Sequence, residues 1–214
     1  VTVRNAQGDK SVASTSLTVV FQSVPSMSIA PLRAVKYNLA DKIIITSSIT
    51  APSGPATAAW TAAGYESNYL LSKSTIPTTS VVQAGTSVFQ LSLKPYSLVS
   101  GKTYTFQLQS AYTSSPAALA TRNIQVVMNK PPSGGSLSVT PSEGTALSTS
   151  FAMNTAYWTD DIADYPLTFS FAYYVLVPSQ LLIVKPEGQI PYASVFLAQG
   201  LKQQQYAVNC IVVA

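Results

Sequence analysis

The stretch of sequence that decides the fold is residues 87–108, SVFQLSLKPYSLVSGKTYTFQL, in which two rows of alternate apolar residues flank a turn. The first row is Phe89, Leu91 and Leu93, and the second is Tyr104, Phe106 and Leu108. Successive side chains of a strand point to opposite faces, so this alternation is typical of strands with one buried face. We therefore expect two strands here.

The same alternation recurs along the chain, and no segment shows the helical repeat of about 3.6 residues. Its other rows are Leu17, Val19 and Phe21, then Ile124, Val126 and Met128, then Leu167, Phe169, Phe171 and Tyr173. Turns containing Pro, Gly and Ser separate the rows, with no helices between them. The sequence therefore predicts an all-β protein of tandem immunoglobulin-like or fibronectin type III-like β-sandwiches.

Two linker-like joints, at residues 22–26 and 129–135, divide the chain into three parts. In the second joint Pro131 and Pro132 stiffen the backbone, and Gly134 and Gly135 let it turn.

The three parts differ in completeness. Residues 1–22, with a turn at Gly8 and Asp9, are interpreted as the C-terminal strands of a preceding immunoglobulin-like domain. Residues 23–128 have the length of one complete sandwich. Residues 129–214 are a second fibronectin III-like sandwich that needs one more edge strand, so we expect it to be truncated and the parent protein to continue.

Only 9% of the residues are charged, against about 25% in a typical soluble domain. Ser, Thr, Gln and Asn fill the polar positions, and such neutral surfaces suit extracellular walls and filaments whose neighbours or glycans cover them. No Asn-x-Ser/Thr sequon is present, so any glycans would sit on Ser, Thr or modified Pro. The basic residues are scattered singly from Arg4 to Lys202, which argues against a nucleic-acid partner.

Several classes of chemistry lack the residues they need. The chain has no histidine and a single cysteine, Cys210, which excludes an internal disulfide, a zinc site and the usual base of a Ser or Cys nucleophile. Cys210 lies in an apolar run and is interpreted as a small buried hydrophobe. No stretch approaches the roughly 20 apolar residues of a membrane span, so we expect no membrane insertion. We expect no enzyme activity.

Two features are interpreted as structural devices. Leu98, Gly101, Tyr104 and Phe106 form the pattern LxxGxxYxF, which in sandwiches places a glycine at a turn and a tyrosine whose hydroxyl bonds back to that turn. Trp60 falls where a strand would place a core tryptophan, and core packing is favoured over sugar stacking.

From residue 87 onward the chain resembles a known family, the receptor for egg jelly (REJ) module of sea-urchin sperm receptors and polycystin-family proteins. The match begins with Leu91, Leu93, Leu98, Gly101, Tyr104 and Phe106 of the first sandwich. The motif NxPPxGGxxxVxPxxGxxLxTxF, followed by WxD and PLxF, carries the resemblance, and its residues are Asn129, Pro131, Pro132, Gly134, Gly135, Val139, Pro141, Gly144, Leu147, Thr149, Phe151, Trp158, Asp160, Pro166, Leu167 and Phe169. The match is close over residues 87–171.

The resemblance implies non-catalytic fibronectin III-like sandwiches in a large ectodomain, often on cilia, flagella or gametes. Residues 1–22 would likewise resemble the tail of an immunoglobulin-like or PKD-type repeat. The family usually has cysteines at the positions of Leu137 and Thr155, which look like a disulfide pair. Both are absent here, as when packing replaces a bridge.

The only concentration of acids is Asp160, Asp161 and Asp164, beside Trp158. Three carboxylates in one loop could hold calcium, and no other cofactor is expected. A role in turns, where Asp bonds nearby backbone amides, is favoured.

Two functions remain open. The first is a rigid spacer or filament building block whose partners are neighbouring domains of the same protein and other surface or filament subunits. The alternative is a carbohydrate- or ligand-binding adhesion module, which needs several exposed, coplanar aromatic rings on one face. The candidate rings are Tyr65, Tyr69, Tyr112, Tyr157 and Tyr192.

Overall fold

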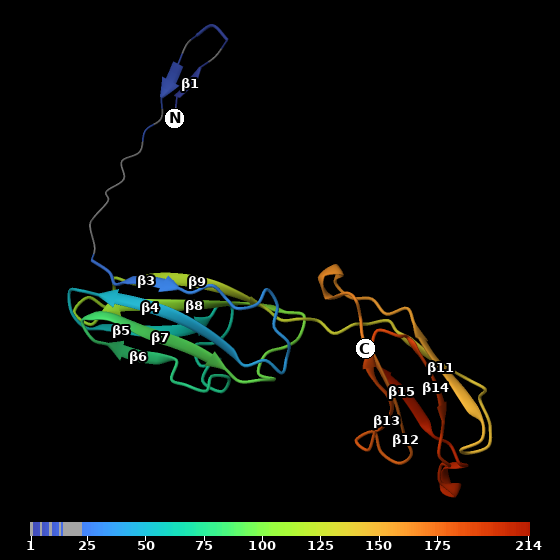
Figure 1. The fold of residues 1–214 in the computed structure, drawn as a ribbon. Coiled ribbons are helices and arrows are strands. Elements are labelled where there is room, and N and C mark those ends of the chain that lie inside the picture. Colours follow the sequence, from blue (N-terminus) through green and yellow to red (C-terminus); the bar gives the residue numbers. More distant parts are fainter. Residues whose placement is uncertain (1, 5, 9, 13, 15–22) are drawn as a thin grey trace. The chain divides into compact units, whose positions relative to one another are not determined.

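The computed structural model describes residues 2–4, 6–8, 10–12, 14 and 23–214. These residues contain strands and two short 3₁₀ helices but no α-helix, so the predicted all-β fold is confirmed (Figure 1). They form two compact units, residues 1–98 with 103–126 and residues 99–102 with 127–214. The three-part division at residues 22 and 128 stays a prediction.

The N-terminal residues contain a short antiparallel pair. Strand β1 (Thr2–Arg4) pairs with β2 (Lys10–Val12), and Gly8 between them has φ +89°. A positive φ suits glycine because it has no Cβ. Asp9 of the predicted turn and the row Leu17, Val19 and Phe21 lie outside the described residues.

The first unit is a sandwich of two antiparallel sheets. One sheet has the order β3-β4-β7 and the other β6-β5-β8-β9. The strands are β3 (Ser26–Ile29), β4 (Ile43–Ala51), β5 (Ala56–Ala62), β6 (Thr79–Val82), β7 (Gly85–Leu93), β8 (Thr103–Tyr112) and β9 (Ala120–Val127).

Both rows predicted from residues 87–108 are buried in this unit. Phe89, Leu91 and Leu93 of β7 and Tyr104, Phe106 and Leu108 of β8 face the core, together with Trp60 of β5. Strand β4 alternates in the same way, since its buried residues occupy every second position. The alternation therefore selects the buried face of each sheet, because the side chains of a strand repeat every two residues.

The second unit contains two sheets of three antiparallel strands, with orders β10-β11-β14 and β13-β12-β15. The strands are β10 (Ser136–Thr140), β11 (Ser150–Ala156), β12 (Phe169–Tyr174), β13 (Leu182–Gly188), β14 (Tyr192–Phe196) and β15 (Asn209–Val213), and the 3₁₀ helices are η1 (Ile162–Asp164) and η2 (Lys202–Gln204). Strands β10 and β15 each lie at the edge of their sheet.

Residues from both sheets form the core of the second unit. Its buried members are Met153, Phe169, Phe171, Tyr173, Ala193, Val195 and Leu197. Of the predicted row at residues 167–173, Phe169, Phe171 and Tyr173 are buried in β12, while Leu167 packs half-buried against the same core just before the strand.

Candidate functional site

The tryptophan of the motif, Trp158, packs directly against Gly135. A Cβ built on Gly135 would lie 2.0 Å from Cε2 of the indole ring, so only glycine fits beneath it. The indole Nε1 donates a hydrogen bond to Oγ1 of Thr155 (2.6 Å), and that hydroxyl donates to the carbonyl of Ser136 (2.8 Å). The motif residues Gly135 and Trp158 therefore act together as a packing unit.

The two positions at which the resemblance implies a cysteine pair face each other in the structure. Leu137 of β10 and Thr155 of β11 are directly opposite in the antiparallel register. Adjacent antiparallel residues have Cα separations within the range that a disulfide spans. In this chain Leu137 instead packs against the core and Thr155 hydrogen-bonds Trp158 and Ser136.

The glycine and proline joint is fastened to the segment that follows Trp158. Ser133 and Thr159 exchange two backbone hydrogen bonds of 2.9 Å each, and the Thr159 hydroxyl donates to the Ser133 carbonyl. Gly134, next to this bridge, has φ +78°, while Pro131 is exposed and Pro132 half-buried. The backbone pairing of Ser133 with Thr159 thus fixes the joint to the segment after Trp158.

The segment after Trp158 forms a turn to which one acidic side chain contributes. Oδ1 of Asp160 accepts a hydrogen bond from the backbone N–H of Asp161 (2.8 Å), and the N–H of Asp164 donates to the carbonyl of Asp161 (2.9 Å). Within the described part of the chain, no three acidic, Cys or His side chains gather closely enough to hold a metal ion.

Tyrosines gather at one place in the first unit. The rings of Tyr65 and Tyr69 stack with centroids 4.0 Å apart, and Tyr104 lies 5.8 Å from Tyr65. Nζ of Lys73 lies 4.7 Å from the centre of the Tyr69 ring and donates to the carbonyl of Ser97 (2.7 Å). Burial, followed by hydrogen bonding to Tyr104, raises the pKa of Tyr69 well above its ordinary value.

The five tyrosines of the ligand-binding alternative do not all contribute exposed rings. Tyr65 is 42% exposed and Tyr69 half-buried, whereas Tyr112 is only 4% exposed. Tyr157 and Tyr192 are exposed but belong to the second unit. Only Tyr65 and Tyr69 among the five stack on each other. In the sequence, only the separation of four residues between Tyr65 and Tyr69 could have indicated that these two rings lie close together.

The remaining predicted structural residues lie in turns and cores. Trp60 is 1% exposed, so it offers no stacking surface, and its Nε1 is buried without a hydrogen-bond partner in the described structure. Gly101 has φ +70° and donates its N–H to the carbonyls of Met128 and Asn129 (3.1 Å each). Tyr104 is buried at the start of β8. Its bond back to the turn stays a prediction.

A hollow in the second unit was not predicted. It lies between β10 and β15 and has a volume of about 1050 Å³. In the described residues, no helix has the length and apolar character needed to cross a membrane.

Comparison with solved structures finds low overall similarity. The FN1–FN3 domains of chicken CNTN1 are 12% identical, with a TM-score of 0.27, over 97% of this chain and 65% of that one. Salmonella alpha-2-macroglobulin reacted with methylamine is 9% identical, with a TM-score of 0.33, over 92% of this chain and 17% of that one. The chain thus spans less than two thirds of each. No curated protein matches.

The family comparison covers far more of the sequence. The model of the REJ domain matches residues 1–214, the whole chain. This agrees with the resemblance carried by the proline, glycine and tryptophan motif, whose residues Gly135 and Trp158 pack together in the structure. The chain therefore belongs to the REJ domain family, whose domain is extracellular in polycystin-type proteins.

Proposed function

We propose that the chain is a non-catalytic structural and interaction segment of a large surface protein, acting as a rigid spacer or filament building block. The observation that carries this proposal is that Gly135 and Trp158 pack on each other and that Gly134 and Gly101 form turns at positive φ, all four outside the hollow between β10 and β15. Other residues of the motif, among them Val139 and Phe151, line that hollow.

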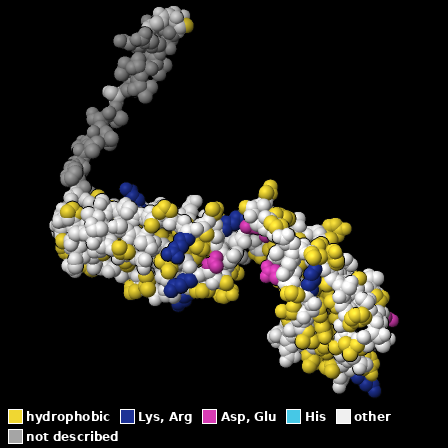
Figure 2. All heavy atoms as spheres, in the orientation of Figure 1, with side chains coloured by type: hydrophobic (Ala, Val, Ile, Leu, Met, Phe, Trp, Pro, Cys, Tyr) yellow, Lys and Arg dark blue, Asp and Glu magenta, His cyan; other side chains and the backbone are white. Residues whose placement is uncertain are grey.

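The polar surface of the first unit supports the same function. Neutral side chains bond one another across neighbouring strands, as Gln90 does with Thr46 (3.0 Å) and Thr50 with Thr86 (3.0 Å). Lys, Arg, Asp and Glu are sparse on the face that Figure 2 shows. Such uncharged ladders can pack against a neighbour without burying unpaired charges, whose desolvation is costly. We propose neighbouring domains and other surface subunits as partners, on a cilium or flagellum.

Rigidity is the property that the spacer role requires. Label pairs, one site in each unit, would give distance distributions by pulsed electron spin resonance in a Cys210→Ser background. A rigid spacer gives one narrow distance distribution, and replacing Pro131 and Pro132 with glycine broadens it. A broad distribution in the unmodified joint would contradict the proposal.

A carbohydrate-binding function has one specific observation in its favour, the stacked and partly exposed pair Tyr65 and Tyr69 with Lys73 beside it. Screening the chain against immobilised glycans tests this second candidate. Binding that Tyr65→Ala abolishes, and that Tyr157→Ala leaves unchanged, would favour it over the spacer function.

A further inference from the structure

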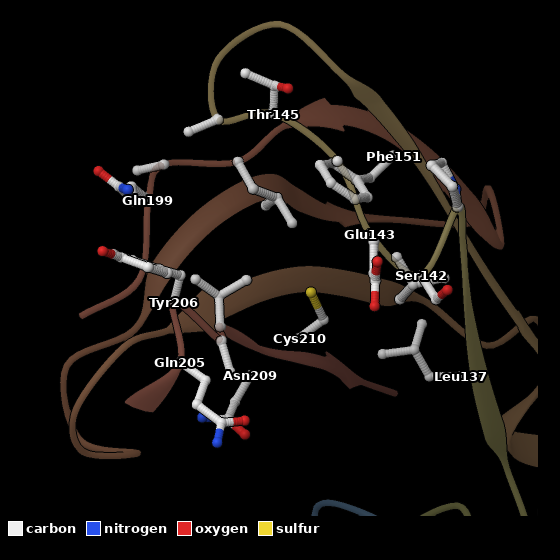
Figure 3. A pocket seen from close by; sticks show the side chains of 18 residues that line it. Leu137, Ser142, Glu143, Thr145, Phe151, Gln199, Gln205, Tyr206, Asn209 and Cys210 are labelled. Carbon is white, nitrogen blue, oxygen red and sulfur yellow. The ribbon is translucent and has the colours of Figure 1, made fainter. Parts of the chain in front are cut away.

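The hollow of the second unit is a groove between the edge strands of its two sheets. Strand β10 ends the β10-β11-β14 sheet and β15 ends the β13-β12-β15 sheet, and residues of both line the groove. Figure 3 shows Leu137, Phe151 and Cys210 around one common space. At about 1050 Å³ the groove has room for several side chains and not merely for water.

The floor and walls of the groove are apolar residues of an incompletely covered core. Val208 and Cys210 on one side and Leu137, Val139 and Phe151 on the other all pack against the buried cluster, yet each stays only half-buried. The residues opposite them in the core, such as Met153 and Phe171, are fully buried. The lining of the groove is therefore apolar along the open side of the sandwich.

Strand β15 also presents an open backbone edge to this side. It pairs through Asn209–Val213 with β12, and in the described structure no other strand pairs with it. An edge strand offers a row of backbone donors and acceptors to an added strand. The five residues of β15 span about 17 Å at roughly 3.3 Å per residue, the length of an ordinary strand.

The charges of the groove restrict its occupant. Of the described residues that line it, Glu143 alone is charged, and the polar ones are neutral side chains such as Ser142, Thr145 and Asn209. An occupant with several charges would lose hydration without finding partners. An uncharged strand with apolar side chains on one face matches this lining, as the strands of the chain itself do.

We propose that this groove accepts an extended polypeptide strand with apolar side chains at alternate positions. The strand pairs with the free edge of β15 and lays its apolar side chains over Val208, Cys210 and the side chains of β10. It completes the core of the second unit by strand addition, and an uncharged apolar strand of this kind is its specific partner.

The single cysteine provides a direct test. Cys210 lines the groove and is the only thiol in the chain, so its modification reports whether the groove is covered. The probe is the peptide acetyl-Thr-Val-Thr-Val-Thr-Val-Thr-amide, added to the full 214-residue chain. At a peptide concentration ten times its dissociation constant, the rate of thiol modification falls about tenfold, because only the free form reacts. The amides of Asn209–Val213 gain hydrogen-exchange protection in parallel.

Two controls separate strand addition from other causes. The same peptide with N-methylated valines keeps its side chains but loses backbone donors, and it protects neither the thiol nor the amides. Val139→Trp fills the groove and abolishes the peptide effect, whereas Val88→Trp, at a position 68% exposed in the first unit, leaves it unchanged. Circular dichroism confirms that each variant folds.

Three outcomes would overturn the proposal. The first is an unchanged thiol rate and unchanged amide exchange at saturating peptide. The second is thiol protection by the N-methylated peptide without amide protection, which indicates an apolar ligand pocket. The third is protection that rises with protein concentration in the absence of peptide, which indicates that a second copy of the chain covers the groove.

Discussion

Replacing Gly135 with alanine tests the packing that underlies the family motif. The added Cβ would lie 2.0 Å from Cε2 and 2.1 Å from Cδ2 of Trp158, far inside van der Waals contact. The indole is rigid, and its Nε1 is held by Thr155 at 2.6 Å, so the ring must move as a whole. Adding one methyl group at residue 135 therefore displaces the whole side chain of Trp158.

The expected cost follows from what the displaced ring loses. A hydrogen bond contributes about 1 kcal/mol and overpacking costs typically about 1–3 kcal/mol, so Gly135→Ala should lower the free energy of unfolding by about 2–4 kcal/mol. Urea unfolding of the chain, followed by circular dichroism, measures it. The matched control is Gly188→Ala, where a Cβ meets nothing within 4 Å, and there we expect a change below about 0.5 kcal/mol.

A double-mutant cycle identifies the cause. In a Trp158→Ala background the clash is gone, so Gly135→Ala should then cost less than about 0.5 kcal/mol. An equal cost in both backgrounds would refute the reasoning, because the loss would then come from the backbone of Gly135 and not from the ring. So would a cost near zero in the unmodified chain.

Three further predictions concern the same unit. Leu137→Cys with Thr155→Cys should form a disulfide across β10 and β11 and, by closing a loop of about 18 residues, stabilise the oxidised over the reduced form by about 3 kcal/mol, measured as the difference in urea midpoint with and without reductant; equal midpoints would contradict it. Thr155→Val leaves the Trp158 Nε1 without its acceptor and should cost about 1–3 kcal/mol, whereas Thr155→Ser keeps the hydroxyl and should cost much less; equal losses would show that the hydroxyl does not matter. Burial raises the pKa of the Cys210 thiol, so the folded chain holds the thiol proton more tightly than the unfolded chain does. The stability that this proton contributes is complete below the ordinary thiol pKa, and it should be lost as the pH rises through the pKa of the folded chain. Cys210→Ala should remove this loss of stability at alkaline pH. If the free energy of unfolding of the variant depends on pH as in the unmodified chain, the loss does not come from Cys210.

The fold could be predicted from the sequence wherever burial follows the two-residue repeat. Phe89, Leu91 and Leu93 are buried as the alternation indicates, because only one face of their strand meets the core. The same holds for Phe169, Phe171 and Tyr173 in the second unit. The pattern specifies which face is inside, and it does so without knowledge of the partner strand.

Features that depend on tertiary geometry could not be predicted in this way. The stacking of Tyr65 on Tyr69 depends on the path of a long loop, which no alternation encodes. The turn after Trp158, in which Asp160 Oδ1 accepts from the N–H of Asp161, depends on the direction of the backbone there, which the spacing of the acidic residues does not encode. The groove arises because β10 and β15 are edge strands of two different sheets, and the sequence of neither strand indicates the order of strands in its sheet.

The family motif occupies an intermediate position. Its glycines, prolines and tryptophan could be recognised together in the sequence, but only the three-dimensional structure explains why Gly135 and Trp158 occur together. Gly135 is required because Trp158 lies on it, and Trp158 is held by Thr155, which lies across the ladder from Leu137. The Gly135 and Trp158 positions of the motif thus correspond to one packing arrangement.

The proposal that this chain is a structural segment is tested most directly by electron cryotomography of the parent protein on its native surface. The account predicts that the domains recur at regular positions in an ordered assembly, with their neutral faces against neighbouring subunits. Isolated, flexible ectodomains with the Tyr65 and Tyr69 face open to solvent would contradict it and favour the ligand-binding function.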